Sequence, residues 1–209
     1  AKLANHELTV IAEGGDGDGY SEGMGHFIAA CRRNQDMTYL VHNNGVFGLT
    51  TGQVSPTGDK GFVSSTTPGG SIEPPFRPAA LAISAGATFV ARGFSGDIDH
   101  LAGLIAEGIR HRGFAFIDVL QVCVSFNPSK NYKWYRDRVR KLEDEGHDRG
   151  DAARALSLAL SESDHLATGV FYQADIPPYE DQVPQLLDGP MVGRDINDID
   201  VAPLMEEFI

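Results

Sequence analysis

Short apolar runs alternate with amphipathic segments along most of this chain. Five runs are rich in β-branched and aromatic residues and end near glycine, asparagine or a charged residue, a pattern that predicts strands. The predicted strands are residues 8–12, 39–42, 88–91, 114–119 and 169–172. The first and fourth are continuously apolar enough to indicate buried strands.

The segments between these runs carry apolar residues at helical spacing. Leu101, Leu104 and Ile105 are one example, and Ser21 is a candidate N-cap for the first helix. The predicted helices are residues 22–34, 78–86, 97–112, 131–145 and 151–163. Because strands and helices alternate, we expect an α/β fold with a parallel sheet and helices on both faces.

Two stretches break the alternation. Residues 50–78 have no periodicity and are rich in Ser, Thr, Gly and Pro, and a loop of that length is usually functional or disordered. Residues 176–209 are acidic and contain several prolines. The sequence therefore predicts one domain over residues 1–175 and a C-terminal arm over 176–209, which we expect to pack on a partner subunit.

Charge and composition exclude several classes of function. The 209 residues include 17 Lys and Arg against 29 Asp and Glu, a net charge of −12, which argues against a nucleic-acid surface. No apolar run approaches the roughly 20 residues that a membrane span needs. Two distant cysteines make no disulfide framework, so we expect a cytoplasmic protein.

The loop 14-GGDGDG-19 lies between the first predicted strand and the first predicted helix. It is not an EF-hand calcium loop, because Ser21 and Phe27 stand where a loop counted from Asp16 needs glycine and glutamate. A glycine loop at a helix start suits a dinucleotide or diphosphate. An aspartate there would repel a diphosphate unless a cation such as Mg²⁺ lies between them.

A second oxygen ligand is available 28 residues after Asp16. Asn44 follows the next predicted strand, and neighbouring parallel strands end side by side, so both side chains can reach one ion. The carbonyl of Val46 is a candidate third ligand. Gly-Asp-Gly followed by Asn-Asn at this distance resembles the thiamine-diphosphate motif, although two turn-forming loops at a sheet edge remain the alternative.

Longer segments resemble one family, the β subunits of 2-oxoacid:ferredoxin oxidoreductases. They are 24-MGHFIAACRRN-34, 44-NGVFGLTTGQVSPT-57, 118-DVLQVCVSFN-127 and 132-YKWYRDRV-139. The resemblance implies the following site residues: Asp16, Asn44 and the Val46 carbonyl as Mg²⁺ ligands, Gly17 and Asp18 as backbone donors to the diphosphate, and Gly48 and Leu49 along the cofactor.

The same resemblance implies the rest of the reaction. Oxidative decarboxylation of a 2-oxoacid would yield an acyl-coenzyme A, with electrons passing through a 4Fe–4S cluster to ferredoxin. Cys123 matches one cluster ligand, whereas the other cysteines would precede the glycine loop, which implies that the N-terminal section of the subunit is missing. An α subunit would supply the activating glutamate, because Glu13 and Glu22 lie near the diphosphate end.

Substrate and class remain open at this stage. Leu49 fits the 2-oxoglutarate-like or broad-range members, and Thr51 stands where some members have lysine. A non-oxidative thiamine enzyme is one alternative, although it would not need Cys123. A non-catalytic binding or structural fragment is the other, and Asp16 and Asn44 count against it.

Overall fold

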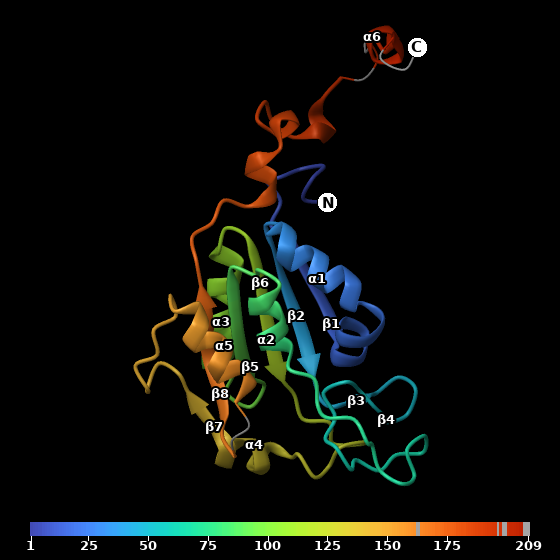
Figure 1. The fold of residues 1–209 in the computed structure, drawn as a ribbon, viewed down its shortest axis with the longest axis vertical. Helices are drawn as coiled ribbons and strands as arrows, with labels where there is room; N and C mark the ends of the chain where they lie inside the picture. The colour runs from blue at the N-terminus through green and yellow to red at the C-terminus, as the bar shows by residue number, and fades with distance from the viewer. Residues whose placement is uncertain (162–163, 196, 198–199, 207–209) are drawn as a thin grey trace.

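The computed structural model describes residues 1–161, 164–195, 197 and 200–206. A six-stranded sheet lies at its centre (Figure 1), with the strand order β1-β2-β6-β5-β8-β7. These strands are β1 (Ile11–Gly15), β2 (Met37–Asn43), β5 (Phe89–Phe94), β6 (Phe114–Leu120), β7 (Val139–Lys141) and β8 (Leu166–Gln173). A small separate hairpin consists of β3 (Val46–Phe47) and β4 (Gln53–Val54).

Helices cover both faces of the sheet, which confirms the predicted α/β class. One face carries α1 (Met24–Arg33), α2 (Pro78–Ser84) and α5 (Ala152–Leu160), and the other carries α3 (Ile98–Arg110). A π-helical turn, Asp18–Glu22, precedes α1. The remaining helices are α4 (Tyr132–Arg138) and α6 (Ala202–Glu206), with 3-10 turns at Tyr179–Gln182, Pro184–Leu186 and Met191–Gly193. No helix in the described part of the chain has the length and apolar character to cross a membrane.

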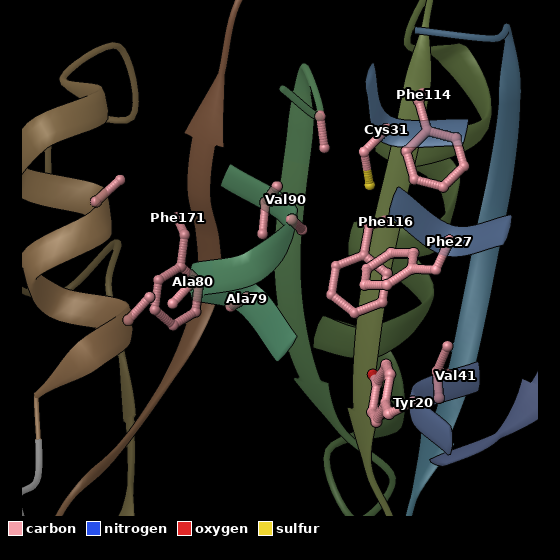
Figure 2. Close-up of a cluster of buried hydrophobic side chains, with 14 of the residues drawn as sticks. Tyr20, Phe27, Cys31, Val41, Ala79, Ala80, Val90, Phe114, Phe116 and Phe171 are labelled. Atoms are coloured by element: carbon pink, nitrogen blue, oxygen red, sulfur yellow. The ribbon is translucent and has the colours of Figure 1, made fainter. Parts of the chain in front are cut away.

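Strand β6 shows how the sequence builds both layers of the core. All seven of its residues are buried, and alternate side chains point to opposite faces. Phe114 and Phe116 pack in the α1 layer, where the Phe27 and Phe116 ring centroids are 4.8 Å apart (Figure 2). Ala115 and Ile117 pack in the α3 layer. The same alternation places Asp118 on the face of Phe114 and Phe116, at the carboxyl end of the strand.

Several predicted boundaries were wrong. The first strand is Ile11–Gly15 and not residues 8–12, and it is an edge strand, with Ile11 48% exposed, so the prediction of a buried strand fails. Ser21 lies inside the π-helical turn, and Gly23 is the N-cap of α1. The helix predicted to reach residue 145 ends at Arg138, because Val139–Lys141 pairs in parallel with residues 166–168.

Two other differences concern the later elements. Strand β8 is antiparallel to β5, so the sheet is mostly but not wholly parallel. The helix predicted over 151–163 ends at Leu160, and its last two predicted positions lie outside the described residues.

The first part of the C-terminal arm is fastened to the body of the same chain. Asn34 Nδ2 donates to the carbonyls of Ile176 and Pro177 at 3.0 and 3.3 Å, and the amide of Asp36 donates to the buried Glu180 carboxylate at 3.0 Å. Beyond these contacts the arm leaves the sheet (Figure 1). Its packing on a partner subunit stays a prediction.

Phe116→Ala is expected to destabilise the chain strongly, because the Phe116 side chain is fully buried in the centre of the aromatic layer. The free energy of unfolding should fall by about 3–5 kcal/mol in a urea titration. Ile98→Ala, at a side chain that is 75% exposed, should change it by less than about 0.5 kcal/mol. Equal effects of the two substitutions would contradict this description of the core.

Candidate cofactor and metal site

The candidate site lies where β1 and β2 end side by side. The two strands are parallel, and Gly15 lies opposite His42. Asp16 therefore emerges beside the Asn43–Asn44 turn, and the amide of Gly45 donates to Asp16 Oδ2 at 3.0 Å. The predicted proximity of the two loops is present in the structure.

Asp16 is a buried carboxylate with an uneven set of partners. The residue is 1% exposed, and Ser55 Oγ and Thr57 Oγ1 donate to Oδ2 at 2.5 and 2.6 Å, in addition to Gly45. Among the described residues, none donates to Oδ1. Burial raises the pKa of Asp16, and the two hydroxyls and the Gly45 amide only partly offset this cost. A cation at Oδ1 would compensate the remaining charge.

Asn44 and Val46 complete a set of oxygen atoms at the turn. Asn44 Oδ1 accepts a hydrogen bond from the Val46 amide at 3.0 Å, and Asn127 Nδ2 donates to the Asn44 carbonyl at 3.1 Å. The Ser55 amide donates to the Gly45 carbonyl, so the next pair along the hairpin, Val46 and Val54, is of the non-hydrogen-bonded kind. The Val46 carbonyl consequently points away from β4. Carboxylate, amide and carbonyl oxygens are the ligands that Mg²⁺ prefers, so the donor set fits this ion.

The glycine loop leaves no room for a side chain at Gly17, just before the helical turn. A Cβ atom at Gly17 would lie 2.4 Å from the ring of Phe47, which packs across the loop from β3. The Asp18 side chain is turned back, and its Oδ2 accepts from the Gly15 amide at 3.0 Å. That the backbone amides of Gly17 and Asp18 donate hydrogen bonds to the diphosphate stays a prediction.

Gly48 and Leu49 lie in the turn of the β3–β4 hairpin. The Leu49 side chain is 99% exposed, and no atom lies within 4 Å of a Cβ built on Gly48. Thr51 and Gly52 close this turn at φ values of 76° and 100°. The structure thus places both predicted cofactor-lining residues on an open surface, and their contact with the cofactor stays a prediction.

The structure adds residues that the sequence analysis did not single out. Thr57 Oγ1 lies 2.8 Å from Asn43 Oδ1, and Asn43 Nδ2 donates to Asp118 Oδ1 at 2.9 Å. This extends the Asp16 cluster to β6. A charged residue inside the apolar run 114–119, and hydroxyls clustered in the irregular segment 50–78, were the available signals.

The two cysteines have different surroundings. Cys31 is fully buried on the inner face of α1, and burial raises its pKa to about 12. Cys123 follows β6, is partly exposed, and its Sγ accepts from the Phe126 amide at 3.4 Å. Within the described part of the chain, no three His, Cys, Asp or Glu side chains gather as a metal cluster would require. The iron–sulfur role of Cys123 stays a prediction.

Comparison with known proteins bears on these features. Residues 1–119 match the family model of the thiamine pyrophosphate enzyme C-terminal TPP-binding domain. Residues 123–188 match the model of the C-terminal part of the pyruvate ferredoxin oxidoreductase β chain. The first match defines the class as a thiamine-diphosphate-binding domain, in agreement with the α/β fold and the loop at the end of β1.

Similar proteins narrow the class. The β subunit of 2-oxoacid:ferredoxin oxidoreductase from Saccharolobus solfataricus is 42% identical over 204 residues, 90% of this chain and 67% of that protein. The equivalent β subunit from a Sulfolobus species is 43% identical over 87% of this chain and 63% of that protein. This chain belongs to the family of 2-oxoacid:ferredoxin oxidoreductase β subunits, as its sequence predicted.

A solved structure agrees with this assignment. The 2-oxoglutarate:ferredoxin oxidoreductase of Magnetococcus marinus, determined with 2-oxoglutarate, coenzyme A and succinyl-CoA bound, superposes with a TM-score of 0.88 at 33% identity. The alignment covers 99% of this chain and 69% of that one. The chain thus spans about two thirds of the length of these relatives.

The buried and the partly exposed thiol should react differently. At pH 8, a thiol with a pKa of about 12 is present as thiolate in roughly one molecule in ten thousand, and Cys31 is also inaccessible. A chromogenic disulfide reagent should label one thiol quickly in the native chain and two in urea. Cys123→Ser should abolish the fast reaction, and rapid labelling of two native thiols would contradict this placement of Cys31.

Proposed function

We propose that this chain binds thiamine diphosphate and Mg²⁺ as part of a 2-oxoacid:ferredoxin oxidoreductase. The complex would oxidatively decarboxylate 2-oxoglutarate or a broad range of 2-oxoacids to the acyl-coenzyme A, with ferredoxin as electron acceptor, in the cytoplasm. One observation carries the proposal: the buried Asp16 carboxylate receives three donors on one oxygen and none of the described donors on the other, beside Asn44 and Val46.

Each residue of the cluster has a defined role in this proposal. Asp16 Oδ1, Asn44 Oδ1 and the Val46 carbonyl hold the metal, while Ser55, Thr57 and Gly45 fix the Asp16 carboxylate through Oδ2. The amides of Gly17 and Asp18 bind the diphosphate at the start of the helical turn. When bound, thiamine diphosphate supplies the nucleophilic carbon that attacks the 2-oxoacid and the electron sink for decarboxylation.

An α subunit is proposed to complete the site. The exposure of Leu49 and Gly48 supports this, because a cofactor held only by this chain would lie on an open surface there. Glu13 Oε1 lies 2.6 Å from His42 Nε2, which gives Glu13 a partner of its own. The activating glutamate is therefore expected from the α subunit.

The oxidative reaction is favoured over non-oxidative thiamine chemistry. Residues 123–188 match a family model named for the β subunit of pyruvate ferredoxin oxidoreductase, and the relatives named above carry ferredoxin in their names. A 4Fe–4S cluster is proposed only for the complete β subunit, with Cys123 as the one ligand from this chain.

Asp16→Ala is expected to abolish Mg²⁺-dependent binding of thiamine diphosphate, because it removes the only charged metal ligand. Titration calorimetry of the chain with thiamine diphosphate, with and without Mg²⁺, measures this directly. The matched control is Asp99→Ala, which removes an exposed aspartate from the first turn of α3 and should leave binding within about twofold.

Binding that survives in Asp16→Ala would contradict the metal assignment. If the wild-type chain binds nothing, the same titrations are repeated with the α subunit added. If the assembled complex does not bind thiamine diphosphate either, the proposed function is contradicted.

A further inference from the structure

A cavity of about 750 Å³ opens beside the metal-binding residues, at the carboxyl ends of β2, β6 and β5. Its wall includes Asn44, Gly45 and Thr57, and Arg92 and Asp118 also line it. The volume is within the range of sites for small molecules, and the carboxyl ends of parallel strands are where such folds bind ligands.

Charged side chains of both signs line the cavity. Besides the pair Arg92 and Asp118, the charged lining residues among those described are Lys60, Arg77, Lys130, Asp59 and Asp164. Lys130 Nζ lies 2.7 Å from Asp59 Oδ1, so these two charges are paired with each other, as are Arg92 and Asp118. An anion in the cavity would therefore depend on hydrogen-bond donors that these pairs leave unused.

Arg92 is held in place from two sides. Its Nε donates to Asp118 Oδ2 at 2.9 Å, and its guanidinium carbon lies 5.3 Å from the centroid of the Phe171 ring. Asp118 is fully buried, and its other oxygen accepts from Tyr20 Oη at 3.1 Å and Asn43 Nδ2 at 2.9 Å. The side chain of Arg92 is 14% exposed, so the pair is largely shielded from water.

In the described part of the chain, this geometry uses only Nε of the Arg92 guanidinium and leaves its two terminal nitrogens available. A purely structural Arg–Asp pair gains most from two parallel bonds. Here Asp118 Oδ1 is occupied by Tyr20 and Asn43, and within the described residues neither terminal nitrogen of Arg92 has a hydrogen bond. Two terminal nitrogens on a fixed plane match the two oxygens of a carboxylate.

We propose that Arg92 binds the distal carboxylate of a dicarboxylic 2-oxoacid in this cavity and so selects such substrates over monocarboxylic ones. The inference rests on the proposed function. The carboxylate next to the oxo group leaves as carbon dioxide, and a guanidinium clamp on it would stabilise the charged ground state and oppose the reaction. The distal carboxylate keeps its charge throughout, so binding it lowers KM without penalising decarboxylation.

The test compares two substrates in the assembled oxidoreductase. Arg92→Met should lower kcat/KM for 2-oxoglutarate by about 10- to 100-fold, mostly through KM, because a charged hydrogen-bonded contact is lost equally from the bound and transition states. Activity on 2-oxobutyrate, which lacks the distal carboxylate, should change less than about threefold. Arg112→Met, at an exposed arginine paired with Asp181, is the matched control and should change neither.

Arg92→Met leaves Asp118 buried without its cation, so it can lower stability. The double variant Arg92→Met/Asp118→Asn removes both charges and keeps an acceptor for Tyr20 and Asn43. It should show the same loss of preference for 2-oxoglutarate. An equal loss on both substrates in the double variant, or a rise in KM for coenzyme A alone, would overturn the role of Arg92 while the proposed function stands. A wild-type complex that oxidises neither substrate would instead overturn both.

Discussion

Burial of the Asp16 carboxylate is the interaction on which the site depends. A carboxylate that loses contact with water has to recover its solvation from fixed donors or a cation. Ser55, Thr57 and the Gly45 amide donate hydrogen bonds to Asp16 Oδ2 and so replace water at one of its two oxygens. These three donors come from the turn after β2 and from the long irregular segment. The segment is thus ordered at this point by a hydrogen-bonding requirement rather than by apolar packing, and the binding loops stay attached to the ends of β1 and β2.

The second buried carboxylate, Asp118, results from the same two-residue period that builds the core. Phe114 and Phe116 fill the layer under α1, and the next residue on that face is charged. Register places Arg92 of β5 opposite Asp118, so the ion pair forms directly between neighbouring strands. Replacing this pair with apolar residues would cost the fold little on general grounds. The position of the pair in the cavity wall is therefore in line with the binding role proposed for Arg92.

The sequence predicted what depends on local pattern. The order of strands and helices, the meeting of Asp16 with the Asn43–Asn44 turn, and the buried run 114–119 all follow from periodicity and from parallel pairing. The sequence prediction was wrong where pairing between distant segments of the chain determines the local structure. Val139–Lys141 lies inside the helix predicted over residues 131–145, but it forms a strand because it pairs with residues 166–168. Ile11 reads as buried and is half-exposed because β1 is at the edge. Ser55 and Thr57 have no periodicity to mark them, and only the folded loop brings them to Asp16.

Thr57 joins the two carboxylates into one system. Its hydroxyl lies 2.6 Å from Asp16 Oδ2 and 2.8 Å from Asn43 Oδ1, yet it carries a single proton. The orientation of Asn43 is fixed, because its Nδ2 donates to Asp118. While Asp16 is ionised, the charged acceptor holds the proton more strongly than the amide oxygen does. A cation on Oδ1, as proposed above, would draw charge away from Oδ2 and weaken that preference. Its binding would then alter the hydrogen bond to Asn43 and, through Asn43, the surroundings of the Asp118–Arg92 pair. The hydrogen bonds of Thr57 and Asn43 thus connect the proposed metal-binding residues with the cavity.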